Sequence, residues 1–336
     1  MTQVTAAKNG NIYVPYEERK GNESIVYFTR EISPEGIKKA YEKVNQHMTG
    51  KVAVKLHTGE KNGPNFTPAS WVKKVLEDEE TLKDATIIET NTYYEGDRDT
   101  TEKHLETLKV NGWTFCPVDI TDSTGTTDLP VKGGKWFDHM TVGKTMINYD
   151  SLFVLTHFKG HVMGGFGGSN KNIGIGCADG KIGKKMIHAR EGEGQWSVAE
   201  EELMEKISES TKATIDFFGK NVCYVNVMRN MSVSCDCEGL QAEPVVTPNV
   251  GILASTDICA IDSASVDLIH AMTEDQHKAL WERMQSRHGF RQLSCMKELG
   301  MGNDRYILID LDNDEVRISP KEAVKDVKPF KRIEVK

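Results

Sequence analysis

Residues 157–177 hold the residue types best suited to chemistry in this chain. Nine of its 29 glycines fall within 160–183, and His161 and Lys171 lie in the same run. An imidazole can ligate a transition metal or move a proton near neutral pH. A desolvated lysine can bind an anion or act as a nucleophile. With His188 close behind, we expect a functional site in which His161 and Lys171 are catalytic.

The glycines of this stretch predict backbone that closely approaches another group, because ordering glycine costs more entropy than ordering any other residue. The spacing matches neither a P-loop nor a dinucleotide-binding G-x-G-x-x-G. Successive backbone N–H groups can still cradle a phosphate or carboxylate. Close packing without a ligand is the alternative. The predicted cofactor-binding residues here are Gly164, Gly165, Gly167, Gly168 and Lys171.

The cysteines of one short turn form a second candidate group. Cys235-Asp236-Cys237 places two soft sulfur donors together, which suits a thiophilic metal or an iron–sulfur centre. The turn lacks the C-x-x-C pairs of a zinc ribbon and the cysteine run of a ferredoxin. We predict metal ligation by Cys177, His188, Cys235 and Cys237. Two ordinary cysteines on a polar turn are the alternative.

Two polar loops earlier in the chain form a third group. His57 follows an apolar run at 51–56, and Arg98 lies in the loop after the run at 85–89. Loops that leave the C-terminal ends of parallel strands carry function in open α/β sheets, so both should lie at one edge. A guanidinium can hold a carboxylate through two parallel hydrogen bonds. We expect His57 to be catalytic and Arg98 to bind an anionic group.

The elements that must position these residues read as alternating strands and helices, which implies parallel pairing and a covered sheet. Strands are predicted at 24–29, 51–56, 85–89, 114–118, 151–156, 222–227, 250–254 and 306–310, and helices at 34–48, 198–218, 257–272 and 274–287. We predict an α/β fold of two lobes, built from parallel or mixed sheets with flanking helices, and a site between the lobes. The predicted segments are a polar lead-in at 1–23, a first lobe at 24–140, a second lobe at 141–320 and a charged tail at 321–336.

Composition narrows the class of protein and its partners. The net charge of −8 and the lack of a basic stripe argue against nucleic-acid binding. No apolar run is long enough for a membrane span, and the start lacks the pattern of a signal peptide. Seven irregularly spaced cysteines indicate reduced thiols and a cytoplasmic protein. We expect a small anionic molecule as partner, with an external electron donor as a further candidate.

In chain order, these residues resemble the family called domain of unknown function 362, often labelled iron–sulfur centre protein. The resemblance covers roughly residues 50–270. It runs through 55–57, 156–161, 165–168, 171–177, His188, 224–226, 235–237, 251–257 and Asp262. Many members carry a ferredoxin module after the position of His188. This chain has only residues 189–195 there, so the resemblance implies no built-in four-iron clusters of ferredoxin type.

The chain also resembles, more distantly, the nickel-pincer lactate racemase family. That family has a histidine, a Gly-Phe-x-Gly-Gly turn, a lysine and a later histidine, in the order of His161, Phe166, Lys171 and His188. The resemblance implies that His161 exchanges a proton, that Lys171 tethers an organic cofactor and that His188 binds nickel. That family has another catalytic histidine at the position where this chain has a pair of tyrosines, residues 93–94. The resemblance therefore does not imply racemisation by two bases.

Together these features predict a metal- or cofactor-dependent enzyme of oxidoreductase or isomerase type that acts on a small anionic organic molecule. The predicted metal is a transition metal, as iron–sulfur or nickel, and the organic cofactor stays open. One alternative is a non-catalytic metal or iron–sulfur carrier that serves a partner protein. Another is a regulatory module that binds a small ligand without turnover. Loss of function in Cys235→Ser with indifference to His161→Ala would select the carrier.

Overall fold

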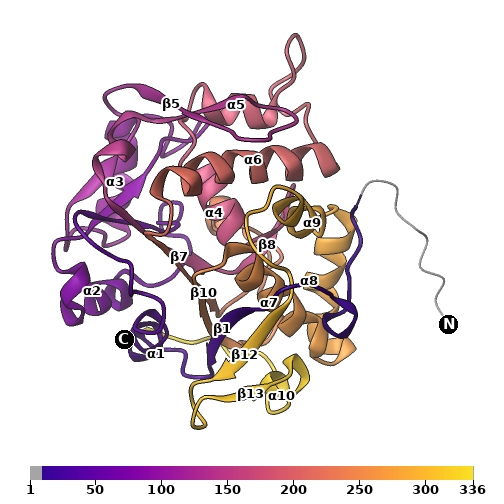
Figure 1. The fold of residues 1–336 in the computed structure, drawn as a ribbon. Helices are drawn as coiled ribbons and strands as arrows, with labels where there is room; N and C mark the ends of the chain where they lie inside the picture. The colour runs from indigo at the N-terminus through magenta and orange to yellow at the C-terminus, as the bar shows by residue number, and fades with distance from the viewer. Residues whose placement is uncertain (1–9, 336) are drawn as a thin grey trace.

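A single large mixed sheet organises the chain in the computed structural model, which describes residues 10–335 (Figure 1). Within that part, nine strands hydrogen-bond in the order β13-β12-β1-β11-β10-β7-β2-β3-β4. Their bounds are β1 (Ser24–Thr29), β2 (Val52–Lys55), β3 (Thr86–Glu89), β4 (Val118–Ile120), β7 (Ser151–His157), β10 (Val222–Met228), β11 (Gly251–Ser255), β12 (Tyr306–Asp310) and β13 (Val316–Ile318). Two hairpins stand apart from it: β5 (Thr126–Pro130) with β6 (His139–Gly143), and β8 (Lys159–His161) with β9 (Gly165–Gly167).

Helices cover both faces of this sheet. They are α1 (Pro34–Tyr41), α2 (Ala69–Asp78), α3 (Thr101–Val110), α4 (Ser169–Gly176), α5 (Gly183–His188), α6 (Glu200–Phe218), α7 (Ile258–Ala271), α8 (Glu274–Ser286), α9 (Arg291–Glu298) and α10 (Pro320–Val324). The alternation of side chains along β7 shows why the sheet needs helices on both faces. Phe153 and Leu155 join the core that contains α1 and α2, whereas Leu152 and Val154 join the core that contains α4, α6 and α7. A strand buried on both faces reads as a continuous apolar run.

The predicted α/β class is confirmed, with a mostly parallel sheet flanked by helices. The pairs β7–β10, β7–β2, β2–β3, β3–β4 and β1–β12 are parallel, and β11 is antiparallel to both β1 and β10. Strands of both predicted lobes share this sheet. For example, β1 of the first predicted lobe lies between β11 and β12 of the second. The division at residue 140 stays a prediction. The helix predicted at 34–48 ends at Tyr41, and the strand predicted at 114–118 begins at Val118.

The predicted lead-in and tail both contact the body of the protein. Residues 1–9 lie outside the described part of the chain. Arg19 forms a buried ion pair with Asp267 at 2.6 Å. The tail begins with α10, and Ile333 accepts a hydrogen bond from Arg229 through its backbone oxygen. No helix in the described residues is both long enough and apolar enough to cross a membrane.

Candidate functional site

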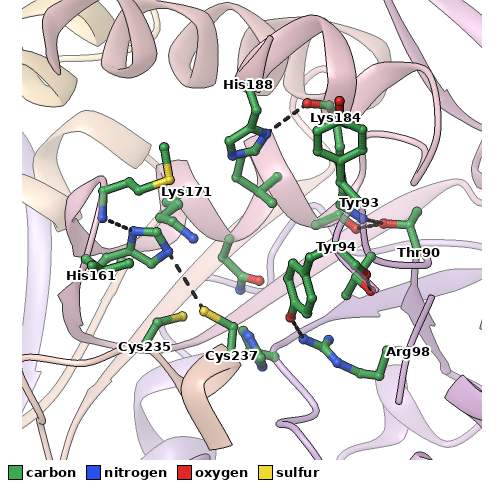
Figure 2. Close-up of a pocket in the computed structure, with 18 of the residues that line it drawn as sticks. Thr90, Tyr93, Tyr94, Arg98, His161, Lys171, Lys184, His188, Cys235 and Cys237 are labelled. Carbon is green, nitrogen blue, oxygen red and sulfur yellow. Dashed lines mark hydrogen bonds between the residues drawn. The ribbon is translucent and has the colours of Figure 1, made fainter. Parts of the chain in front are cut away.

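A cavity of about 340 Å³ lies where β2, β3 and β7 end (Figure 2). The loops after β2 and β3, the β8–β9 hairpin, α4, α5 and the turn that follows β10 all contribute side chains to it. The predicted site residues that line it are His57, Arg98, His161, Gly167, Gly168, Lys171, His188, Cys235 and Cys237. Because the carboxyl ends of parallel strands lie at one edge of a sheet, the segments that follow β2, β3 and β7 meet there.

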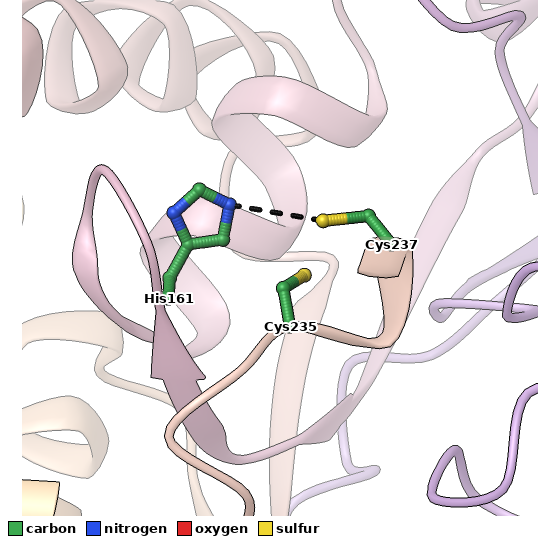
Figure 3. A group of neighbouring side chains, drawn as sticks. All are labelled: His161, Cys235 and Cys237. Atoms are coloured by element: carbon green, nitrogen blue, oxygen red, sulfur yellow. Dashed lines mark hydrogen bonds between the residues drawn. The ribbon is translucent and has the colours of Figure 1, made fainter. Parts of the chain in front are cut away.

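His161 ends β8 and is held by the tight turn of the hairpin. Its Nδ1 accepts hydrogen bonds from the backbone N–H groups of Met163 at 3.1 Å and Gly164 at 2.8 Å. Burial, with the nearby Lys171 ammonium, lowers the pKa of His161 to about 4, so the ring is neutral. A neutral imidazole whose Nδ1 accepts must carry its proton on Nε2. His161 therefore points an N–H group at the sulfur of Cys237, 4.0 Å away (Figure 3).

His57 repeats this arrangement from the loop after β2. Its Nδ1 accepts the backbone N–H of Gly59 at 3.0 Å, which again leaves the proton on Nε2. Burial lowers the pKa of His57, and its hydrogen bond with Cys235 partly opposes that shift. Two neutral imidazoles from different parts of the chain thus present N–H donors to the cysteine pair.

The turn with the two cysteines is anchored by the residue between them. Asp236 is buried and its Oδ2 accepts hydrogen bonds from His157 Nδ1 at 2.8 Å and Lys159 Nζ at 3.0 Å. Burial alone would raise the pKa of Asp236, but His157 and Lys159 hold it well below its usual range. Asp236 itself does not line the cavity, whereas its neighbours Cys235 and Cys237 do.

The two cysteine sulfurs and Nε2 of His161 lie within 4.8 Å of one another (Figure 3). The thiol of Cys237 holds the pKa of Cys235 well below its ordinary value, with Lys171 and His161 adding to the effect. The adjacent Cys235 raises the pKa of Cys237 well above its ordinary value. The pair therefore reads as one thiolate beside one thiol, a soft donor group.

Cys177 does not join this group, so the predicted third thiolate is wrong. It caps the end of α4, is 1% exposed and packs in the apolar core beside Ile173 and Ala178. Burial raises its pKa to about 12, so it stays protonated. Cys177 is a core residue, like many free cysteines.

His188 lines the cavity but stands apart from the three-atom group that His161 forms with the sulfurs. Its Nδ1 donates to the backbone oxygen of Lys184 at 2.8 Å, which leaves the lone pair on Nε2. Burial lowers its pKa to about 3. The ring stacks on Tyr93 at 6.2 Å and meets Trp196 edge-on at 5.0 Å. Its predicted role as a metal ligand beside the thiolates stays a prediction.

The glycine turn serves close packing more than anion binding. The first N–H groups of α4, those of Ser169 and Asn170, donate to the carboxylate of Asp262 at 2.8 and 2.9 Å. The chain's own carboxylate thus fills the predicted anion cradle at this helix start. A Cβ at Gly168 would lie 2.5 Å from Asp262, and Gly165 needs its φ of +74°. Gly164 and Gly165 do not line the cavity, so the structure favours packing for these two.

Basic side chains dominate the charged lining of the cavity, and they differ in their partners. Lys171, on α4, has no hydrogen bond or ion pair among the described residues. Arg98 already holds the carboxylate of Glu60, through Nε at 3.0 Å and Nη2 at 2.6 Å. The two N–H groups that were predicted to bind a substrate anion therefore already donate to Glu60. Lys55 is paired with Glu89 at 2.8 Å.

Sequence reasoning missed several lining residues. They were not named as site residues, although Lys159 lies in the run 157–177 and Tyr93 in the loop of Arg98: Lys55, Lys159, Lys184, Tyr93 and Trp196. A lysine inside an apolar strand was the available signal for Lys55, because unpaired burial of an ammonium is costly. Lys184 and Trp196 carried no such signal in their spacing.

An α/β protein with a basic pocket around a cysteine–histidine group is the class that the fold and site define. The chain belongs to the family described as domain of unknown function (DUF362), whose model matches residues 52–267. The predicted family is thereby confirmed.

Solved structures similar to the chain include the following two. The lactate racemase apoprotein from Thermoanaerobacterium thermosaccharolyticum shares 11% identity at a TM-score of 0.36, over 94% of this chain and 88% of that one. A protein from Thermotoga maritima shares 11% identity at a TM-score of 0.40, over 78% of this chain and 59% of that one. No curated protein matches the chain.

Proposed function

We propose that this protein is a metal-dependent enzyme that acts on a small anionic organic molecule in the described cavity. The observation that carries the proposal is the group of two cysteine sulfurs and one imidazole nitrogen within 4.8 Å, set in a basic pocket. Cys235 and Cys237 hold a thiophilic transition-metal ion, which supplies Lewis-acid or redox chemistry when bound.

The donor set fits a single metal ion better than a cluster. A four-iron cluster takes four cysteine thiolates, and the cavity offers two among the described residues. His161 donates its Nε2–H toward these sulfurs, because its Nδ1 is already occupied by two backbone N–H groups. His57 is arranged in the same way. Both act as partners that orient and stabilise the thiolates, a role known to tune bound metals.

The lining supports an anionic and partly apolar substrate. The side chain of Lys171 forms no hydrogen bond or ion pair with residues 10–335, so it is free to bind an incoming carboxylate or phosphate. The apolar part of the lining is Val162, Met163, Ile175 and Trp196. His188 keeps a lone pair on Nε2, so its neutral imidazole can accept a hydrogen bond from the substrate.

Metal content of protein made anaerobically in metal-replete medium tests the proposal. We expect near-stoichiometric metal by elemental analysis, and thiolate-to-metal charge-transfer absorption after cobalt substitution. The double variant Cys235→Ser, Cys237→Ser should lose both signals. The matched control Cys116→Ser, Cys295→Ser changes two thiols outside the cavity and should keep them. Metal-free wild-type protein after reconstitution with nickel, zinc, cobalt or iron would overturn the proposal.

A carrier gives a different pattern in the same variants. A carrier needs the sulfurs but not the groups that hold a substrate. Metal transfer to an acceptor that survives in both Lys171→Ala and His188→Gln would therefore favour the carrier over the enzyme.

A further inference from the structure

Lys184 presents its amine to the cavity on the far side from the cysteine pair (Figure 2). Its Nζ donates to Thr90 Oγ1 at 2.6 Å and to the backbone oxygen of Asn91. The hydroxyl of Thr90 donates its own proton to the backbone oxygen of Gly176 at 3.2 Å, so toward Lys184 it can only accept. Two neutral oxygens thus take two N–H bonds of the Lys184 amine.

The nearby carboxylates are committed elsewhere. Glu89 is paired with Lys55 at 2.8 Å and also accepts two hydrogen bonds from Thr58. Asp122 accepts the backbone N–H groups of Asn91 and Gly180. Lys184 forms no ion pair within residues 10–335. It is therefore a buried lysine with polar contacts but no counter-charge.

This environment suits a neutral amine. An ammonium has three N–H donors, and the third would face the cavity without an acceptor. A neutral amine has two, and its lone pair is left for the cavity. Burial lowers the pKa of Lys184 to about 8, assisted by the positive charges of Arg98 and Lys55 and opposed by Asp122 and Glu89. Desolvated lysines near other cations are the ones that form Schiff bases.

We propose that the Nζ of Lys184 condenses with the carbonyl group of a small oxo acid, and that such oxo acids are the substrate class of this pocket. The lone pair attacks the carbonyl carbon and a C=N bond replaces the C=O bond. Both amine hydrogens leave with the oxygen as water, and the imine nitrogen takes one proton from solvent. Lys171 lines the same cavity and forms no ion pair within residues 10–335, so its charge attracts the carboxylate into the pocket. This inference rests on the anionic-substrate part of the proposed function and not on the metal.

Reductive trapping tests the imine directly. The metal-free protein, residues 1–336, is incubated with pyruvate and sodium borohydride, and the product is examined by intact mass and peptide mapping. We expect one reduced adduct per chain on Lys184. The adduct should be absent in Lys184→Arg and retained in Lys185→Arg, whose side chain is exposed on the same helix. Replacing pyruvate with acetone should lower the yield at least tenfold, because acetone lacks the carboxylate.

The outcomes separate this inference from the metal proposal. Trapping in the Cys235→Ser, Cys237→Ser variant supports the imine even where metal binding has failed. Wild-type protein that binds metal but gives no adduct overturns the imine alone. Modification of Lys171 or Lys185 with Lys184 unmodified also overturns it. Mapping of the wild-type adduct decides the matter if Lys184→Arg does not fold.

Discussion

The carboxylate of Asp236 lies 2.8 Å from Nδ1 of His157, a contact between the turn that bears both cysteines and the end of the central strand β7. Lys159 reaches the same carboxylate at 3.0 Å. The other ring nitrogen of His157 donates to the backbone oxygen of Arg229 at 2.6 Å. The geometry of the cysteine pair therefore depends on one buried carboxylate, that of Asp236, which lies between the two cysteines in the sequence.

Asp236→Asn should destabilise the protein and loosen the cysteine turn. The change breaks the buried ion pair with Lys159, and the loss of one partner of such a pair typically costs about 3–5 kcal/mol. Denaturant unfolding measures the loss, and metal content per folded chain should fall with it. Asp138→Asn removes the acid of the exposed pair with His139 and should leave both readouts unchanged. Equal stability of the two variants would contradict the anchoring role.

Lys171→Ala should make the cysteine pair less reactive toward an anionic reagent. The ratio of alkylation rates with iodoacetate and iodoacetamide measures the local positive potential. Removing one nearby charge is worth about 1 kcal/mol, so the ratio should drop about fivefold. Because the described part of the chain offers Lys171 no hydrogen bond or ion pair to lose, the melting temperature should stay within a few degrees. Lys132→Ala, at an exposed position, is the control and should leave the ratio unchanged. An unaltered ratio in Lys171→Ala would remove the anion-binding role.

Gly168→Ala should disturb the start of α4 and, through it, the position of Lys171. The added Cβ would lie 2.5 Å from Asp262 Oδ1, so the carboxylate must leave the N–H groups it caps. Lost caps cost about 1 kcal/mol, and the clash adds to this. Thermal unfolding and the alkylation ratio should both respond. Gly194→Ala, where no atom lies within 4 Å, should behave like the wild type. Matching behaviour of the two variants would show that Asp262 can shift freely.

His104→Phe should make the protein more tolerant of acid. His104 is fully buried, and both its ring nitrogens lack a partner among the described residues. Burial lowers its pKa to about 3, below the unfolded value of 6.5, so the unfolded chain binds the extra proton. Stability therefore falls as the pH drops below 6.5. Between pH 7.5 and pH 5 this histidine accounts for about 2 kcal/mol of that loss.

Denaturant unfolding at both pH values should show that the variant loses about 2 kcal/mol less unfolding free energy than the wild type between pH 7.5 and pH 5. His47→Phe, at an exposed position, is the control and should follow the wild type. An unchanged pH dependence in His104→Phe would mean that His104 finds a proton acceptor in the folded state.

Local patterns predicted most of the sheet and the gathering of the site. The apolar runs at 151–156 and 222–227 read as strands because both faces of each are covered, and the structure pairs them in parallel. His161, Lys171 and the two cysteines follow strand ends or lie on turns, which is where α/β folds collect function. Their convergence therefore follows from topology.

Long-range partners could not be read from local patterns. Asp262 caps α4 from 93 residues away, so a helix start that looked free for a ligand is already filled. Cys177 follows a glycine-rich segment and Cys235 lies on a polar turn, so both look available for a ligand in the sequence. In the structure Cys177 caps the end of α4 and packs in the core. The tautomer of His161 depends on two backbone N–H groups whose direction is set by the hairpin turn.

The place of β1 between β11 and β12 has a consequence for synthesis on the ribosome. Both neighbours of this N-terminal strand are translated late, and the first of them, β11, begins 222 positions after β1 ends. At translation rates of about 5–20 residues per second, β1 waits roughly 10–45 s for its first partner. Every residue that lines the cavity, from Lys55 to Cys237, has been made by then. The nascent chain thus carries β1 with both of its edges unpaired throughout this interval, and this is when it most needs protection from aggregation.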